Sequence, residues 1–151
     1  MYQKILVPVD GSAESERALQ EAVHLARLID SRLVLLHVVD AYHLLLTQPT
    51  TASFDEARQA CLESGQALLD QHADSLEASG LPFEAVLREV LSNRVSSAIL
   101  DEASRRQCGL IVMGMHGRNG RTRLSLGSDA EHVVRASMVP VLLVRAGAAA
   151  S

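Results

Sequence analysis

The sequence lacks tryptophan, has few other aromatic residues and contains only two cysteines. Aromatic residues make up 3% of the 151 residues, so aliphatic side chains must fill the core. Cys61 and Cys108 lie far apart and form no metal or redox spacing, and we expect both to be reduced thiols. A chain of this length is expected to form one domain whose core needs neither a metal ion nor a disulfide.

Long apolar runs and an excess of basic residues are also absent. No apolar run approaches the roughly 20 residues of a membrane-spanning helix, and the apolar stretch before Asp10 is too short for a secretory signal. The net charge of −4 argues against nucleic-acid binding, for which a basic domain is expected. We therefore expect a soluble cytoplasmic protein that binds neither nucleic acid nor membrane.

Strand patterns alternate with helix patterns along the chain. Short apolar runs predict buried strands at residues 5–9, 33–39, 110–113 and 140–144, and alternation predicts an edge strand at 83–90. Helices are predicted after Ser12 and at 54–78, 93–107 and 128–137, whereas 41–53 is expected to be a loop. This order predicts an α/β fold, a doubly wound five-stranded parallel sheet of order 3-2-1-4-5 with helices on both faces. The domain is expected to span residues 1–146, and 147–151 to form a disordered tail.

Two unusual stretches are predicted to meet at one crevice of this sheet. Ligands of doubly wound sheets bind beyond the carboxyl ends of the strands, where the winding direction reverses. In the predicted order the reversal falls between the first and fourth strands. Asp10 ends the first strand and Gly114 ends the fourth, so the turn after one and the loop after the other flank the same crevice.

The loop after the fourth strand is rich in glycine and arginine. Its glycines permit positive φ and close approach of the main chain to a ligand, and Gly127-Ser128 then opens a helix whose free N–H groups favour an anion. The residues concerned are Gly114, Gly117, Gly120, Arg118, Arg121 and Arg123. These features predict a phosphate cradle, and the alternative is an exposed loop in which Ser128 is an ordinary helix cap. The P-loop and dinucleotide fingerprints are both absent from the sequence, so the crevice suits a mononucleotide.

The spacing of these residues also resembles that of a known family. Gly114-x2-Gly117-x9-Gly127-Ser128 resembles the nucleotide-binding signature of the universal stress protein family, G-x2-G-x9-G-[S/T]. KILVPVDGS, LVLLHVVD, CGLIVMGMHGR and SMVPVLLVR are similar to four strand regions of that family, so the resemblance covers essentially the whole domain. It implies a Rossmann-like domain of the adenine nucleotide alpha hydrolase type that binds ATP, forms a homodimer and is induced under stress.

The resemblance also implies roles for individual residues. Asp10 would hold the ribose or adenine region, and Pro8 and Val9 would line the base pocket. Val38 would offer its main chain to adenine, and Met113 would contact the nucleoside. The phosphates would be surrounded by Gly114, Gly117, Gly127 and Ser128 and by the main-chain N–H groups of Asp129 and Ala130.

Asp129 departs from the family pattern, which usually has a small or apolar residue at this position. A carboxylate there suits the helix dipole, but it would repel a triphosphate unless Mg²⁺ lay between them. We therefore expect ATP as the cofactor, with Mg²⁺ as a candidate companion. His116 is expected to be an exposed loop residue, with a functional role as the alternative.

Three classes of function remain open from the sequence. The first is a nucleotide-dependent regulatory homodimer with a protein partner that the sequence does not identify. The second is a slow ATPase or nucleotidyl transferase, for which the sequence offers no clear catalytic base, with Asp10, Asp129 and His116 as the nearest options. The third is a protein-interaction module with an empty pocket.

The last predicted strand and the 41–53 segment bear on partners. The last strand ends the sheet and is apolar on both faces, which invites antiparallel pairing with a second copy through Val139, Val141 and Leu143. Within 41–53, the leucines at 44–46 could cover the pocket, extend the second helix or meet a partner.

Overall fold

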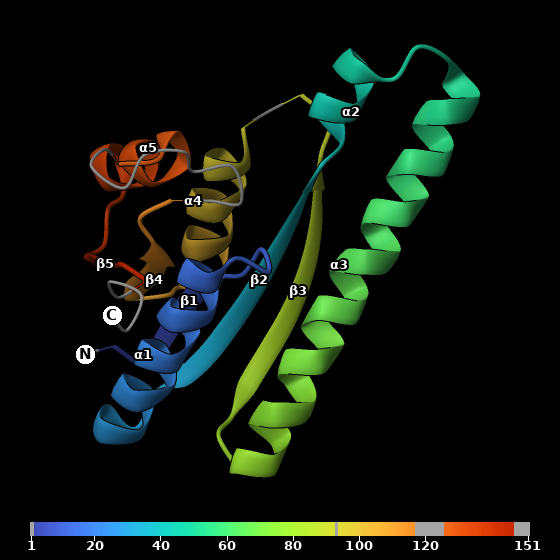
Figure 1. The fold of residues 1–151 in the computed structure, drawn as a ribbon. Helices are drawn as coiled ribbons and strands as arrows, with labels where there is room; N and C mark the ends of the chain where they lie inside the picture. Colours follow the sequence, from blue (N-terminus) through green and yellow to red (C-terminus); the bar gives the residue numbers. More distant parts are fainter. Residues whose placement is uncertain (1, 93, 117–125, 147–151) are drawn as a thin grey trace.

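The computed structural model of the protein describes residues 2–92, 94–116 and 126–146. Its five strands form one parallel sheet of order β3-β2-β1-β4-β5, which confirms the predicted fold class and strand order (Figure 1). The strands are β1 (Lys4–Pro8), β2 (Arg32–Asp40), β3 (Phe83–Val90), β4 (Leu110–Gly114) and β5 (Val141–Val144). The helices are α1 (Ala13–Ile29), α2 (Ala41–Thr47), α3 (Thr51–Ser79), α4 (Val95–Arg105) and α5 (Ser128–Ala136).

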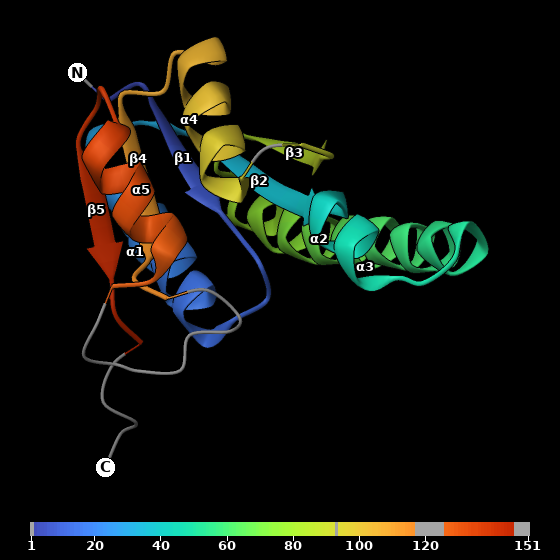
Figure 2. The same ribbon diagram turned by 90° about the horizontal axis from the view of Figure 1, so that it is seen from above.

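Two apolar cores lie on opposite faces of the sheet, because successive strand residues point to opposite sides. In β1, Ile5 and Val7 pack with α1 and α3, whereas Leu6 packs with α4 and α5. Figure 2 shows these helix pairs on either side of the sheet. Both faces are therefore covered, which explains why the inner strands read as nearly continuous apolar runs.

The 41–53 segment is not the loop that the sequence suggests. It contains α2 and the first residues of α3, and α2 lies beyond the carboxyl ends of β2 and β3 (Figure 1). The Asp40 carboxylate caps α2 by accepting the N–H of His43, and Thr50 caps α3 in a reciprocal capping box with Ser53. Helix α2 ends before Pro49 because the residue preceding a proline disfavours helical geometry. A helix of seven residues is too short to give a clear periodic pattern, which is why it was missed.

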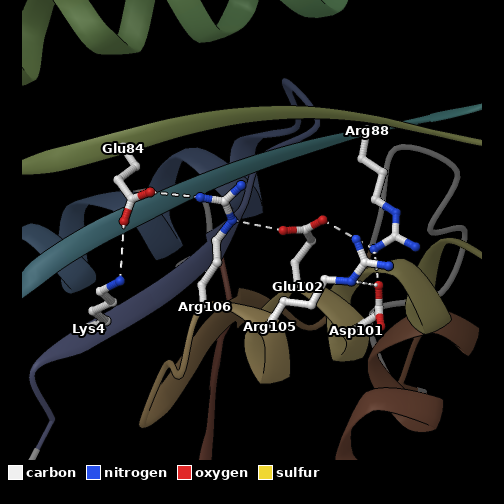
Figure 3. A network of polar contacts seen from close by, with 7 residues as sticks. All are labelled: Lys4, Glu84, Arg88, Asp101, Glu102, Arg105 and Arg106. Carbon is white, nitrogen blue, oxygen red and sulfur yellow. Dashed lines mark hydrogen bonds and ion pairs between the residues drawn. The ribbon is translucent and has the colours of Figure 1, made fainter.

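A network of ion pairs joins α4 to β3 and β1 (Figure 3). At its centre the Glu102 carboxylate is buried and accepts from Arg88 Nη1 at 3.2 Å and Arg106 Nε at 2.8 Å. Arg106 also reaches Glu84, which pairs with Lys4. The network fixes the edge strand β3 against α4, which borders the carboxyl edge of the sheet.

Two further features of the described residues concern the membrane and the cysteines. None of the helices in the described ranges is long and apolar enough to cross a bilayer. Both cysteines are free thiols, and burial raises the pKa of the Cys108 thiol to about 11, so that thiol stays protonated near neutral pH. The expected tail at 147–151 lies outside the described residues.

The central carboxylate of the network provides a test of this arrangement. Replacing Glu102 by Gln should lower the free energy of unfolding by about 2–4 kcal/mol, because two arginines lose the buried charge that pairs with them. Replacing Glu21 by Gln, which removes an exposed helix pair with Arg17, should cost less than about 0.5 kcal/mol. Urea unfolding of both variants measures the difference, and equal costs would contradict a central role for Glu102.

Candidate functional site

A cavity opens where β1 and β4 separate at the carboxyl edge of the sheet. The two strands are paired only at Ile5↔Leu110 and Leu6↔Ile111, although both continue beyond these residues. The cavity has a volume of about 780 Å³, within the range of roughly 300–1,000 Å³ typical of small-ligand pockets. Of the eleven residues predicted for the site, ten line it: Pro8, Val9, Asp10, Val38, Met113, Gly114, Gly127, Ser128, Asp129 and Ala130. The remaining one, Gly117, lies outside the described residues.

Asp10 forms a tight turn at the floor of the cavity. Its Oδ1 accepts the N–H of Ser12 at 2.9 Å, and its own N–H donates to Ser15 Oγ at 3.2 Å. Gly11 follows with a φ of 82°, a left-handed conformation that glycine adopts without strain. Within the described residues Oδ2 makes no hydrogen bond, so Asp10 can shape the turn and still accept a ligand hydroxyl.

The main chain of Val38 faces the cavity. Leu36 accepts the N–H of Val9 at 2.8 Å, so the main-chain groups of Leu36 point toward β1. Alternate residues of a strand direct these groups to the same side, so those of Val38 point there too. The β1–β2 register ends at Pro8↔Leu36, which leaves Val38 without a strand partner on that side. A strand residue with one free donor and one free acceptor matches the polar edge of a heterocyclic base.

The amino end of α5 forms another wall. Gly127, and not Ser128, occupies the N-cap position, so the alternative that Ser128 is the helix cap is wrong. The first helical bond runs from Glu131 N–H to Gly127 O, which leaves the N–H groups of Ser128, Asp129 and Ala130 without helical partners. Gly127 N–H donates to Met115 O at 2.9 Å and ties this wall to the end of β4. Three free N–H groups at a helix start favour an anion.

His116 is not the exposed loop residue that the sequence suggests. Its side chain is only 8% exposed, and its Nδ1 and main-chain N–H lie 3.0 and 2.6 Å from the Glu14 carboxylate of α1. Burial opposes ionisation of Glu14, but the hydrogen bonds from His116 outweigh it and lower the pKa of Glu14. Sequence reasoning missed this pair because its members are 102 positions apart.

The conformation of Gly114 differs from the expected one. It does not adopt the positive φ that the sequence suggests, since the described glycines with positive φ are Gly11 and Gly80. A Cβ at Gly114 would instead lie 2.9 Å from the Cβ of Glu14. Gly114 therefore lets the end of β4 pack directly against α1. Gly120 lies outside the described residues.

Helices α2 and α3 supply a wall that sequence reasoning missed. It is formed by His43, Leu44, Ala60, Cys61, Ser64 and Gly65, with His37 of β2 beside them. Leu44 thus lines the cavity, as one of the alternatives for this segment held, while Leu45 and Leu46 are exposed.

His37 lies between β2 and α3 because Gly65 has no side chain. The His37 Nδ1 lies 2.7 Å from Val9 O, and a carbonyl only accepts, so Nδ1 carries the proton. A Cβ at Gly65 would lie 2.5 Å from the His37 ring. A glycine inside a long helix lowers helix stability, so its presence in the predicted helix indicates a close contact at that position. This feature of the sequence could have revealed the contact.

Comparison with known proteins gives the same fold and one family. A sequence model of the universal stress protein family matches residues 1–145. Universal stress protein MJ0531 of Methanocaldococcus jannaschii is 31% identical over 145 residues, which covers 96% of this chain and 83% of that protein.

Two solved structures extend the comparison. The structure of protein MJ0577 of the same organism superposes with a TM-score of 0.85 at 27% identity and covers 96% of both chains. A universal stress protein of Arabidopsis thaliana, solved with AMP bound, shares the fold with a TM-score of 0.69 at 21% identity, covering 95% of this chain and 91% of its own.

The contact between Gly65 and His37 gives a test of the missed wall. Replacing Gly65 by Ala should lower the free energy of unfolding by about 1–2 kcal/mol, because the new methyl group forces the His37 ring away from Val9 O. This cost is larger than the stabilisation that alanine brings to a helix relative to glycine. Replacing the neighbouring exposed Ser64 by Ala should change it by no more than about 0.5 kcal/mol. Denaturant unfolding measures both variants. A stabilised Gly65→Ala variant would refute the close packing.

Proposed function

The chain belongs to the universal stress protein family, and on that premise we propose that it is a cytoplasmic, nucleotide-dependent regulator that binds ATP. The observation that carries the proposal is the convergence of three groups in one cavity. They are the free main-chain edge of Val38, the Asp10 carboxylate and the three N–H groups at the start of α5. Their chemistry matches a base, a ribose and a phosphate in that order.

The base and sugar end has the most specific support. Val38 offers a donor and an acceptor for adenine, and Pro8, Val9 and Met113 supply apolar surface around it. Asp10 Oδ2 accepts a ribose hydroxyl. A protein of the same fold has been solved with AMP, which supports an adenine nucleotide as the ligand class.

The phosphate end depends on α5. The N–H groups of Ser128, Asp129 and Ala130 receive the phosphate oxygens, and the Ser128 hydroxyl is available because Gly127 holds the cap position. Mg²⁺ would find one or two carboxylates here, Asp129 and Asp40, and the nucleotide phosphates would supply further ligands. The described residues contain no group of three or more metal-ligating side chains, so such an ion would depend on the nucleotide.

Regulation is better supported than hydrolysis. A catalytic base must be able to reach the attacking water. In the proposed complex Asp10 holds the ribose with its free Oδ2, its Oδ1 accepts Ser12 N–H, and His116 is paired with Glu14. Bound nucleotide is therefore expected to persist and to order the cavity walls.

A homodimer through the edge of β5 belongs to the same proposal. Pro140 and Val144 accept N–H groups from Ile111 and Met115, so the main chain of Val141 and Leu143 points away from β4. No strand lies beyond β5 in the described part of the chain. Val139, Val141 and Leu143 are partly buried against the α4–α5 core, while Met138 and Leu142 are exposed at the same edge. Antiparallel pairing of two such edges would satisfy the free groups of both copies.

The nucleotide test begins with the purified protein. Denaturation followed by chromatography should release ATP, and incubation should not convert it to ADP. Replacing Asp10 by Asn should weaken nucleotide affinity by about tenfold or more, because a charged acceptor for the ribose is lost. Replacing Asp30 by Asn, at the far end of α1, is the matched control and should leave the affinity unchanged, since Asn also suits its φ of 57°.

The outcomes separate the three classes of function. Accumulation of ADP would favour an enzyme. Absence of nucleotide, together with no binding of added nucleotide in a calorimetric titration, would favour an interaction module with an empty pocket. An unaffected affinity in the Asp10→Asn variant would contradict the assigned role of Asp10.

The dimer has its own test. Light scattering at micromolar concentration should give the mass of two chains. Replacing Leu143 by Pro should give monomers, because proline removes an outward N–H while the bonds of β5 to β4 remain. Leu143→Ala shortens the side chain but keeps the N–H, and it should remain dimeric. A wild-type monomer, or a dimeric proline variant, would contradict pairing through this edge.

A further inference from the structure

The geometry points to Asp129 as the residue that makes this cavity select among adenine nucleotides by the charge of their phosphates, with AMP preferred over metal-free ATP. The inference rests on the proposed function, because it assumes that an adenine nucleotide occupies the cavity.

Asp129 stands where the phosphates of the proposed ligand would end. It is the second residue of α5 and lines the main cavity beside Gly127 and Ser128. It also lines an adjoining cavity of about 760 Å³, and Asp40, Val95 and Ser128 are likewise shared by both. A nucleotide tail that extends from the N–H groups of α5 toward the adjoining cavity therefore passes this carboxylate.

The Asp129 side chain lies close to the first turn of α4. The main chain of Ser96, in that turn, favours the charged form of the Asp129 carboxyl group and lowers its pKa, against the larger effect of burial. Three residues further along α5, His132 Nδ1 lies 2.7 Å from the hydroxyl of the same buried Ser96. Helix α5 is thus tied to α4 beside the Asp129 carboxylate.

A second carboxylate faces the same space. Asp40 ends β2 and is fixed by the N–H of His43 at 3.0 Å. Within the described residues neither Asp40 nor Asp129 forms an ion pair. Among the described residues, the other charged or titratable groups of the adjoining cavity are Tyr42, Arg94 and His132, and His43 lines the main cavity.

The electrostatics of Asp129 agree with an acidic opening. Although the residue as a whole is exposed, burial of its carboxyl group raises its pKa, and the charge of Asp40 adds to the rise. The main chain of Ser96 and the charges of Arg94 and His132 oppose it. The raised pKa means that negative charge is disfavoured at this place, and an incoming phosphate group brings further negative charge to it.

The effect of the Asp129 charge on binding depends on the number of phosphates that the nucleotide carries. Adenosine carries no charge, and one phosphate is accommodated by the N–H groups of α5. A second and a third phosphate add charge near Asp129, and the described residues offer no further helix start to receive it. Two unit charges within several ångströms at a protein surface change an equilibrium by about tenfold. The wild-type affinity should therefore fall from AMP to ATP in the absence of a divalent cation.

Calorimetric titrations in EDTA test the inference with adenosine, AMP, ADP and ATP as probes. The wild-type protein should bind ATP about tenfold more weakly than AMP. Asp129→Asn should improve ATP affinity by about tenfold and AMP affinity by less than about threefold, because the carboxylate that repels the second and third phosphates is removed. Thermal unfolding checks that the Asp129→Asn variant is folded.

Glu131→Gln is the matched control. Glu131 lies in the same first turn and loses the same charge, but it pairs with Arg135 and lies outside both cavities. Its ratio of ATP to AMP affinity should equal that of the wild type.

Three results would overturn the inference. An equal change in ATP and AMP affinity on Asp129→Asn, or a wild type that binds ATP as tightly as AMP in EDTA, overturns it alone. The second result needs no variant and holds even if Asp129→Asn fails to fold. Failure of the wild type to bind any of the four probes overturns the proposed function as well.

Discussion

The register between β1 and β4 ends at Leu6 and Ile111, and the rest of the site depends on that separation. Main-chain donors and acceptors in a protein interior must find partners. Beyond the end of β1, the groups of Val38 on β2 and the N–H groups at the start of α5 face one cavity. The reversal of winding direction thus creates both the space and the polar groups that surround it.

Main-chain packing, more than side-chain chemistry, fixes the walls of this cavity. Gly114 brings the end of β4 against α1, and Gly65 brings α3 against the His37 ring. The carboxylates at the opening are each held by an N–H of a nearby turn or helix start, as Asp10 is by Ser12 and Asp40 by His43. A site built from fixed dipoles and fixed charges suits the proposed role of holding a nucleotide in one pose.

The sequence was informative where the signal was local or periodic. Apolar runs located the strands, and the rule that ligands bind at the winding reversal brought Asp10 and Gly114 to one crevice. Contacts between distant segments carried no such signal: the Glu14–His116 pair and the His132–Ser96 bond join residues that no periodic pattern connects. The short helix α2 was missed because one face of seven residues shows no period. The roles of Gly114 and Gly65 required knowledge of which helix lies beside each.

The central claim is that main-chain groups of β2 and α5 receive the two ends of one adenine nucleotide. The most direct measurement is a crystal structure of the protein grown with excess magnesium nucleotide. The account predicts the adenine edge on the main chain of Val38, a ribose hydroxyl on Asp10, and phosphate oxygens on the N–H groups of residues 128–130. A vacant cavity at saturating nucleotide, or a nucleotide bound elsewhere on the molecule, would contradict it.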